Sequence, residues 1–164
     1  MRLFLASSAY MGNLEKLRQN FPMIEARWTP KENLHLTYHF LGDAYRPETI
    51  IEKLQGIEYV KKYVPLIGLG NFGKPPRILY ANATDETLLS LHDEIEKRLD
   101  FQTDRPFKPH ITLARIKKAD NTSAFKKVLE DYKNEVLGEI YTELKLFKSI
   151  LTNQGAHYEK IHTF

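Results

Sequence analysis

Two short motifs of one pattern, His35-Leu36-Thr37 and His110-Ile111-Thr112, carry the residues of this chain best suited to chemistry. Each motif lies in an apolar run that follows a polar or proline-containing stretch. An imidazole can take up or release a proton near neutral pH, and a threonine hydroxyl is a neutral hydrogen-bond donor. Two histidines with two hydroxyls are therefore suited to phosphoester transfer without a metal, with one imidazole as acid and the other as base.

The residue types around both motifs favour β-strands, since they are rich in β-branched, aromatic and leucine side chains. Side chains alternate between the two faces of a strand, so His35 and Thr37 share one face, and His110 and Thr112 share another. Residues two apart on a strand stand about 6 to 7 Å from each other. A histidine and its threonine can therefore converge on one phosphate.

A structural interpretation competes with the catalytic one. A single histidine on a strand is more often half-buried and hydrogen-bonded to a backbone carbonyl than catalytic. One His-x-Thr triplet is also a weak motif. Two matched motifs in matched contexts favour the catalytic interpretation.

The rest of the chain predicts an α+β fold of antiparallel sheet backed by helices. Because each half holds one motif strand and at least one helix, we expect one domain over residues 1–164, with two pseudo-symmetric lobes around a central cleft that carries both motifs. Asp85 is a candidate N-cap. The expected strands are 2–7, 26–29, 34–41, 64–72, 78–83 and 110–116, the helices are 11–20, 47–60, 85–99 and 121–132, and residues 139–152 and 157–164 form a hairpin.

Composition narrows the class of protein. The chain has no cysteine, which excludes disulfides, thiolate metal sites and a cysteine nucleophile. No segment approaches the roughly 18 apolar residues of a membrane span, so we expect a cytoplasmic protein without membrane contact. The net charge of +3 allows nucleic-acid binding but does not by itself indicate it. Basic residues near the motifs form either a positive rim or solvated loop ends, namely Lys74, Arg77, Arg105, Lys108, Arg115, Lys117 and Lys118.

No metal or cofactor site is expected. His35 and His39 have the spacing of a zinc-protease pair, but the glutamate and the helix of that motif are missing. Strict alternation places His39 on the face of His35, where it either contacts substrate or has a structural role. His92 lies on the apolar stripe of its helix and is expected to be packed or half-exposed rather than catalytic. No glycine-rich loop has the spacing of a nucleotide-binding motif.

Taken together, these residues resemble the two-histidine phosphoesterase superfamily, and specifically the bacterial and archaeal RNA 2′,3′-cyclic phosphodiesterases, also called 2′-5′ RNA ligases. The resemblance runs nearly end to end. It is carried by segments 2–6, 27–28, 32–37, 40–42, 70–73, 76–81, 105–115 and 146–149.

The resemblance implies two similar α+β lobes around a cleft, and it implies roles for individual residues. His35 is expected to act as general acid and His110 as general base, while Thr37 and Thr112 hold phosphate oxygens. Arg115 is similar to a family arginine near the phosphate. Strict alternation puts Arg115 on the face opposite His110, unless the strand ends or bulges there.

The expected reaction is metal-independent hydrolysis of a terminal 2′,3′-cyclic phosphate on RNA, or on a related small cyclic nucleotide, to a 2′-phosphate. No cofactor is implied, and we expect a monomer, although the sequence does not fix the oligomeric state. Two alternatives stay open: 2′-5′ ligation of tRNA halves by the same acid and base, and a module that binds a nucleotide or RNA end without turnover.

Overall fold

The structure, a computed structural model, describes residues 2–101 and 105–164. Its strands are β1 (Arg2–Tyr10), β2 (Ile24–Trp28), β3 (His35–Gly42), β4 (Tyr63–Phe72), β5 (Ile78–Ala83), β6 (His110–Ala119), β7 (Val136–Tyr141), β8 (Lys145–Thr152) and β9 (Gly155–Thr163). Its helices are α1 (Leu14–Arg18), α2 (Pro47–Leu54), α3 (Glu86–Leu99) and α4 (Thr122–Asp131), with a 3₁₀ turn, η1, at Lys31–Asn33. The expected α+β class with antiparallel sheet is confirmed.

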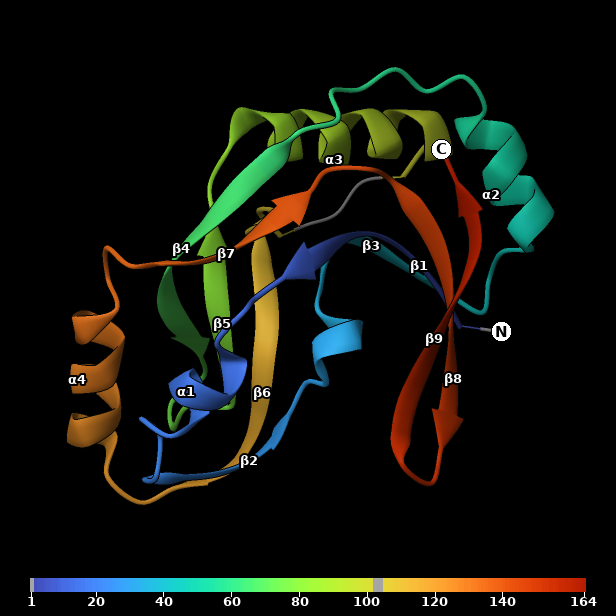
Figure 1. Cartoon of the computed structure of the whole chain (residues 1–164). Coiled ribbons are helices and arrows are strands. Elements are labelled where there is room, and N and C mark those ends of the chain that lie inside the picture. Colours follow the sequence, from blue (N-terminus) through green and yellow to red (C-terminus); the bar gives the residue numbers. More distant parts are fainter. Residues whose placement is uncertain (1, 102–104) are drawn as a thin grey trace.

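The strands form two groups that meet along two seams (Figure 1). One group runs β9-β8-β1-β3 and the other runs β7-β4-β5-β6-β2. All neighbours within the groups are antiparallel, and the groups are joined by the pairs β1–β7 and β3–β6. The seam between β3 and β6 places the two motif strands side by side.

Both strand groups contribute to one connected apolar core. Leu5 and Leu36 of the first group and Leu79 and Ile111 of the second are all fully buried in it. Helices α2 and α3 pack together at the top of Figure 1, and α1 and α4 lie at its left. No helix in the described part of the chain is long and apolar enough to cross a membrane.

Helix α3 follows the sequence pattern closely. The carboxylate of Asp85 accepts a hydrogen bond from the backbone N–H of Thr87 at 2.8 Å, as expected of an N-cap. The apolar stripe is buried, and His92 within it is only 6% exposed. His92 is therefore packed, which is one of the two structural positions that the sequence predicts.

Two predicted helices are too long. The helix expected over 47–60 ends at Leu54, because Gly56 adopts φ 74° and the left-handed conformation ends a helix. The helix expected over 11–20 is confined to Leu14–Arg18, where Leu17 alone is buried.

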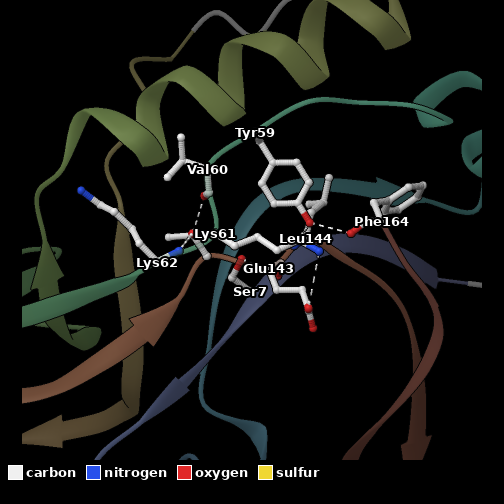
Figure 2. A network of polar contacts seen from close by, with 9 residues as sticks. Ser7, Tyr59, Val60, Lys61, Lys62, Glu143, Leu144 and Phe164 are labelled. Atoms are coloured by element: carbon white, nitrogen blue, oxygen red, sulfur yellow. Dashed lines mark hydrogen bonds and ion pairs between the residues drawn. The ribbon is translucent and has the colours of Figure 1, made fainter.

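The predicted strand 139–152 is also wrong in one respect, because it breaks between β7 and β8. Thr142 there accepts a hydrogen bond from the backbone N–H of Lys62 and donates one to the carbonyl of Val60. The Tyr59 hydroxyl likewise accepts from the N–H of Leu144 and donates to the carbonyl of Phe164, as Figure 2 shows. The backbone at the break bonds to a distant loop, which periodicity alone cannot reveal.

A buried hydrogen-bond chain ties the same break to the first motif strand. Ser7 of β1 donates to the carbonyl of Glu143 at 2.8 Å. Since that proton is used, the Tyr38 hydroxyl of β3 donates to the Ser7 oxygen at 2.9 Å. Residues of β1, β3 and the segment between β7 and β8 are thereby held together.

Candidate active site

The two motifs meet directly across the β3–β6 seam. Leu36 pairs with Ile111 in antiparallel register, and both side chains are buried in the core. Extending the register by one residue each way sets His35 opposite Thr112 and Thr37 opposite His110, all four on the face away from Leu36 and Ile111. The two histidines are then diagonal neighbours, about 7 to 8 Å apart.

Each histidine is oriented by the backbone two residues before it. The Nδ1 of His35 lies 2.6 Å from the carbonyl oxygen of Asn33, and the Nδ1 of His110 lies 2.7 Å from that of Lys108. A carbonyl can only accept, so each Nδ1 carries a proton and donates it. In each neutral ring, Nε2 is therefore the nitrogen that can accept a proton.

Aromatic side chains hold both imidazole rings. The ring of His35 lies against Phe4 and Tyr158, with centroids 5.2 and 5.1 Å away. The ring of His110 lies edge-on to Phe72 and Tyr80, at 5.0 and 5.4 Å. Each histidine thus has its own backbone hydrogen bond and its own pair of aromatic rings, although different strands supply the rings.

Burial against these rings lowers the pKa of both imidazoles. Desolvation is the largest cause for His35, where the charges of His110 and Arg115 lower the pKa further and the bond to Asn33 opposes the shift. Desolvation also dominates the lowered pKa of His110, where the bond to the Lys108 carbonyl opposes the shift and the charge of Lys108 lowers the pKa further. Mutual repulsion between two nearby imidazoles disfavours the doubly protonated state.

Arg115 faces the site because β6 contains a bulge. Tyr80 pairs with Thr112, but the preceding Leu79 pairs with Ala114, which leaves Leu113 as an extra residue. An extra residue shifts the alternation by one, so Arg115 returns to the face of Thr112. Its charge acts on both His35 and Tyr158. Strict alternation, which placed Arg115 on the other face, is wrong here.

A matching bulge removes His39 from that face. Leu5 pairs with His39 and Ala6 pairs with Thr37, so Tyr38 is the extra residue of β3. The expectation that His39 shares a face with His35 is therefore wrong, and His39 is 4% exposed. Beyond the bulge, Phe40 occupies the position in β3 that Arg115 occupies in β6.

His39, His92 and Glu96 form the one group of metal-ligand types found among residues 2–101 and 105–164, with ligand atoms within 4.8 Å of one another. The two imidazoles stack at 4.3 Å and 19°, and Nε2 of His39 is 3.2 Å from the carbonyl of His92. His92 also stacks on Phe107 at 4.1 Å, just before the second motif. Rings stacked face to face do not direct their nitrogens at one point, so the group fits packing better than metal binding.

A cavity of about 510 Å³ adjoins the motifs. Phe4, Tyr158 and Arg115 line it, while none of the four motif residues does. This cavity thus lies beside the motifs, next to the rings that contact His35. The Nζ of Lys145 donates a hydrogen bond to the Ser8 hydroxyl at 3.1 Å. Ser8 of β1 pairs with His35, so this contact lies on the face of β1 that His35 shares.

Sequence reasoning did not assign Phe4, Phe72, Lys145 or Tyr158 to the site. The sequence gives Tyr80 no assigned role there either. These residues come from β1, β4, β5, β8 and β9, and only strand pairing brings them to the motifs. A lysine or phenylalanine on a distant strand carries no local signal for such a position.

Comparison with known proteins decides the family. The family model described as LigT like Phosphoesterase matches this chain twice, over residues 5–80 and 81–158. The chain belongs to the LigT-like phosphoesterase family. The double match of this phosphoesterase also agrees with the paired motifs and paired bulges, which mark two related halves.

Curated relatives of this LigT-like phosphoesterase are similar over nearly their whole length. The RNA 2′,3′-cyclic phosphodiesterase of Methanocaldococcus jannaschii is 32% identical, with 98% of each chain covered. The protein of the same name from Aeropyrum pernix is 32% identical, with 93% of this chain and 94% of the relative covered.

Solved structures show the same fold. Escherichia coli LigT complexed with 3′-AMP matches with a TM-score of 0.77 at 23% identity, covering 99% of this chain and 96% of that one. A Thermus thermophilus protein, TT0787, matches with a TM-score of 0.69 at 26% identity, covering 100% and 97%.

Proposed function

We propose that this phosphoesterase hydrolyses the 2′,3′-cyclic phosphate at the end of an RNA to a 2′-phosphomonoester, with two histidines and no metal. The names of the curated relatives support the substrate class. The residues at the β3–β6 seam support the mechanism, because they supply an acid, a base and donors to a phosphate without any further group.

In this proposal, neutral His110 takes a proton from water through Nε2 as the water oxygen attacks phosphorus. Protonated His35 gives its Nε2 proton to the 3′ oxygen as the bond from that oxygen to phosphorus breaks. Thr37 and Thr112 donate to the non-bridging oxygens, and Arg115 adds positive charge where negative charge develops. One proton enters at His110 and one leaves from His35, so the pair must exchange a proton with solvent after each turnover.

One observation carries the proposal: both histidines donate Nδ1–H to a carbonyl two residues earlier. This bond fixes the tautomer and the ring orientation in the same way at two sites. A structural histidine needs no such match with a second histidine across a strand seam. Acid–base catalysis on one phosphate does need both Nε2 atoms available.

The test is product identification. The protein is incubated in EDTA with a short RNA that ends in a 2′,3′-cyclic phosphate, and the phosphomonoester is identified by ³¹P NMR. The proposal expects a 2′-phosphate. A 3′-phosphate would contradict the direction of ring opening, and activity that disappears in EDTA and returns with a divalent cation would contradict metal independence.

A further inference from the structure

Positive charge is concentrated in the cavity beside His35. Three arginines, Arg2, Arg27 and Arg115, are among its lining residues, and no lining residue in the described part of the chain is acidic. The whole protein carries a net charge of only +3. The cavity is therefore far more basic than the molecule around it.

Two of these arginines are direct cross-strand neighbours. Arg27 of β2 pairs with Arg115 of β6, and both side chains are exposed. Like charges directly opposite each other destabilise a sheet. Within residues 2–101 and 105–164, neither guanidinium forms an ion pair with a carboxylate. Two adjacent guanidinium groups without acidic partners are suited to two neighbouring phosphate groups.

An exposed aromatic ring lines the same cavity. Phe40 is 79% exposed, although phenylalanine usually lies in the interior. The bulge at Tyr38 turns Phe40 to the face of His35, and its ring lies 6.2 Å from that of Phe4. A solvent-exposed ring beside unpaired arginines is typical of a surface that stacks a nucleobase.

We propose that this cavity binds the nucleotide that precedes the cyclic phosphate end, with Arg27 on its phosphodiester and Phe40 against its base. This inference rests on the proposed function for the identity of the substrate end. An RNA with a cyclic phosphate at its 3′ end extends from there only in the 5′ direction, so its further phosphates must lead away from the histidines. Arg115 faces His35, and Arg27 is the next cation outward.

The subsite predicts a preference for chain length. Diadenylate with a terminal 2′,3′-cyclic phosphate should be hydrolysed with about tenfold higher kcat/KM than adenosine 2′,3′-cyclic phosphate. Arg27→Gln and Phe40→Ala should each reduce that ratio at least fivefold. Arg46→Gln is the matched control, because Arg46 lies on the surface before α2, beside Glu48, and should leave the ratio unchanged.

Binding separates this inference from the proposed function. Affinities of diadenylate 2′-phosphate and adenosine 2′-phosphate are measured by calorimetry at several salt concentrations, which needs no turnover. Tighter binding of the dinucleotide, and a salt slope reduced by about 0.7 in Arg27→Gln, would support the subsite even if neither cyclic ester were hydrolysed. Equal affinities for the two ligands, or a loss in Arg27→Gln that is equal for both, would overturn it.

Discussion

Burial of two imidazoles side by side determines how the site should respond to pH. Both pKa values are lowered, and the proposed mechanism needs one ring charged and the other neutral. At a pH below both pKa values, both rings are charged and no base remains. At a pH above both, both rings are neutral and no acid remains. The kcat/KM profile should therefore be bell-shaped with its optimum below pH 6.5, since kcat/KM reports the free enzyme.

The profile of kcat should lie at higher pH than that of kcat/KM. A bound phosphate anion favours the charged imidazole and raises its pKa. Initial rates across pH 4.5 to about 9 on the cyclic dinucleotide would measure both profiles. A kcat/KM optimum at pH 7 or above would contradict the effect of burial described for the free enzyme.

The Tyr38–Ser7–Glu143 chain allows a comparison of two single-atom-scale changes. Ser7→Ala leaves both the Tyr38 hydroxyl and the Glu143 carbonyl without the partner that joined them, and should lower the free energy of unfolding by about 1 to 3 kcal/mol. Tyr38→Phe keeps the bond from Ser7 to Glu143 and should cost about 1 kcal/mol. Urea denaturation measures the loss of unfolding free energy in both variants. A larger loss in Tyr38→Phe than in Ser7→Ala would contradict this hydrogen-bond chain.

Much of the residue-level site could be predicted from the sequence. Alternation along a strand places each histidine with its threonine, and the face they share is as expected. Arg115 and His39 could not be placed, because each follows a bulge that depends on pairing with another strand. Such an insertion leaves no mark in the periodicity of its own strand.

At the scale of elements, β4 and β5 together position His110. Gly70 of β4 pairs with Tyr80 of β5, and a Cβ on Gly70 would lie 2.5 Å from the Tyr80 ring. Tyr80 is 3% exposed and contacts Phe72 and His110, so it has little room to move. This close approach explains why a glycine stands in the strand.

Gly70→Ala should therefore displace Tyr80 and misplace His110. We expect kcat/KM to fall about 10- to 100-fold, since small displacements of catalytic groups are costly. Gly12→Ala is the control, because nothing lies within 4 Å of a Cβ built there. Wild-type kcat/KM in Gly70→Ala would show that Tyr80 does not position the histidine.

Element boundaries were harder to predict than element types. Asp85 caps its helix as the sequence indicates, and Asn121, the expected first residue of the helix 121–132, caps that helix. By contrast, the strand break after Tyr141 depends on hydrogen bonds to residues 59–62, which are far away in the sequence. Local sequence patterns predict elements that local interactions determine. Hydrogen bonds to residues far away in the sequence can end a strand without any local signal.

At the scale of the whole molecule, the two related halves exchange strands. Residues 5–80 include β4, which pairs with β7 of the second half, and residues 81–158 include β8, which pairs with β1 of the first. Each strand group therefore needs strands from both halves. The sequence predicts two lobes, but this exchange follows only from the pairing of distant strands.

We therefore expect the chain to unfold as one domain. Fragments 1–80 and 81–164 should each lack a cooperative thermal transition by circular dichroism, whereas the intact chain should show a single one. Mixing the fragments should restore part of the signal, because the core and the seams require both. Cooperative folding of either fragment alone would argue for two independent domains.

In the proposed function, His35 and His110 act as the acid–base pair on an RNA cyclic phosphate. This assignment is tested most directly by rates of hydrolysis of a 2′,3′-cyclic phosphate RNA by His35→Ala, His110→Ala and the surface control His157→Ala. We expect losses of about 100- to 10,000-fold for the first two and wild-type activity for the third, with all three folded. Near-wild-type turnover by either His35→Ala or His110→Ala would contradict it.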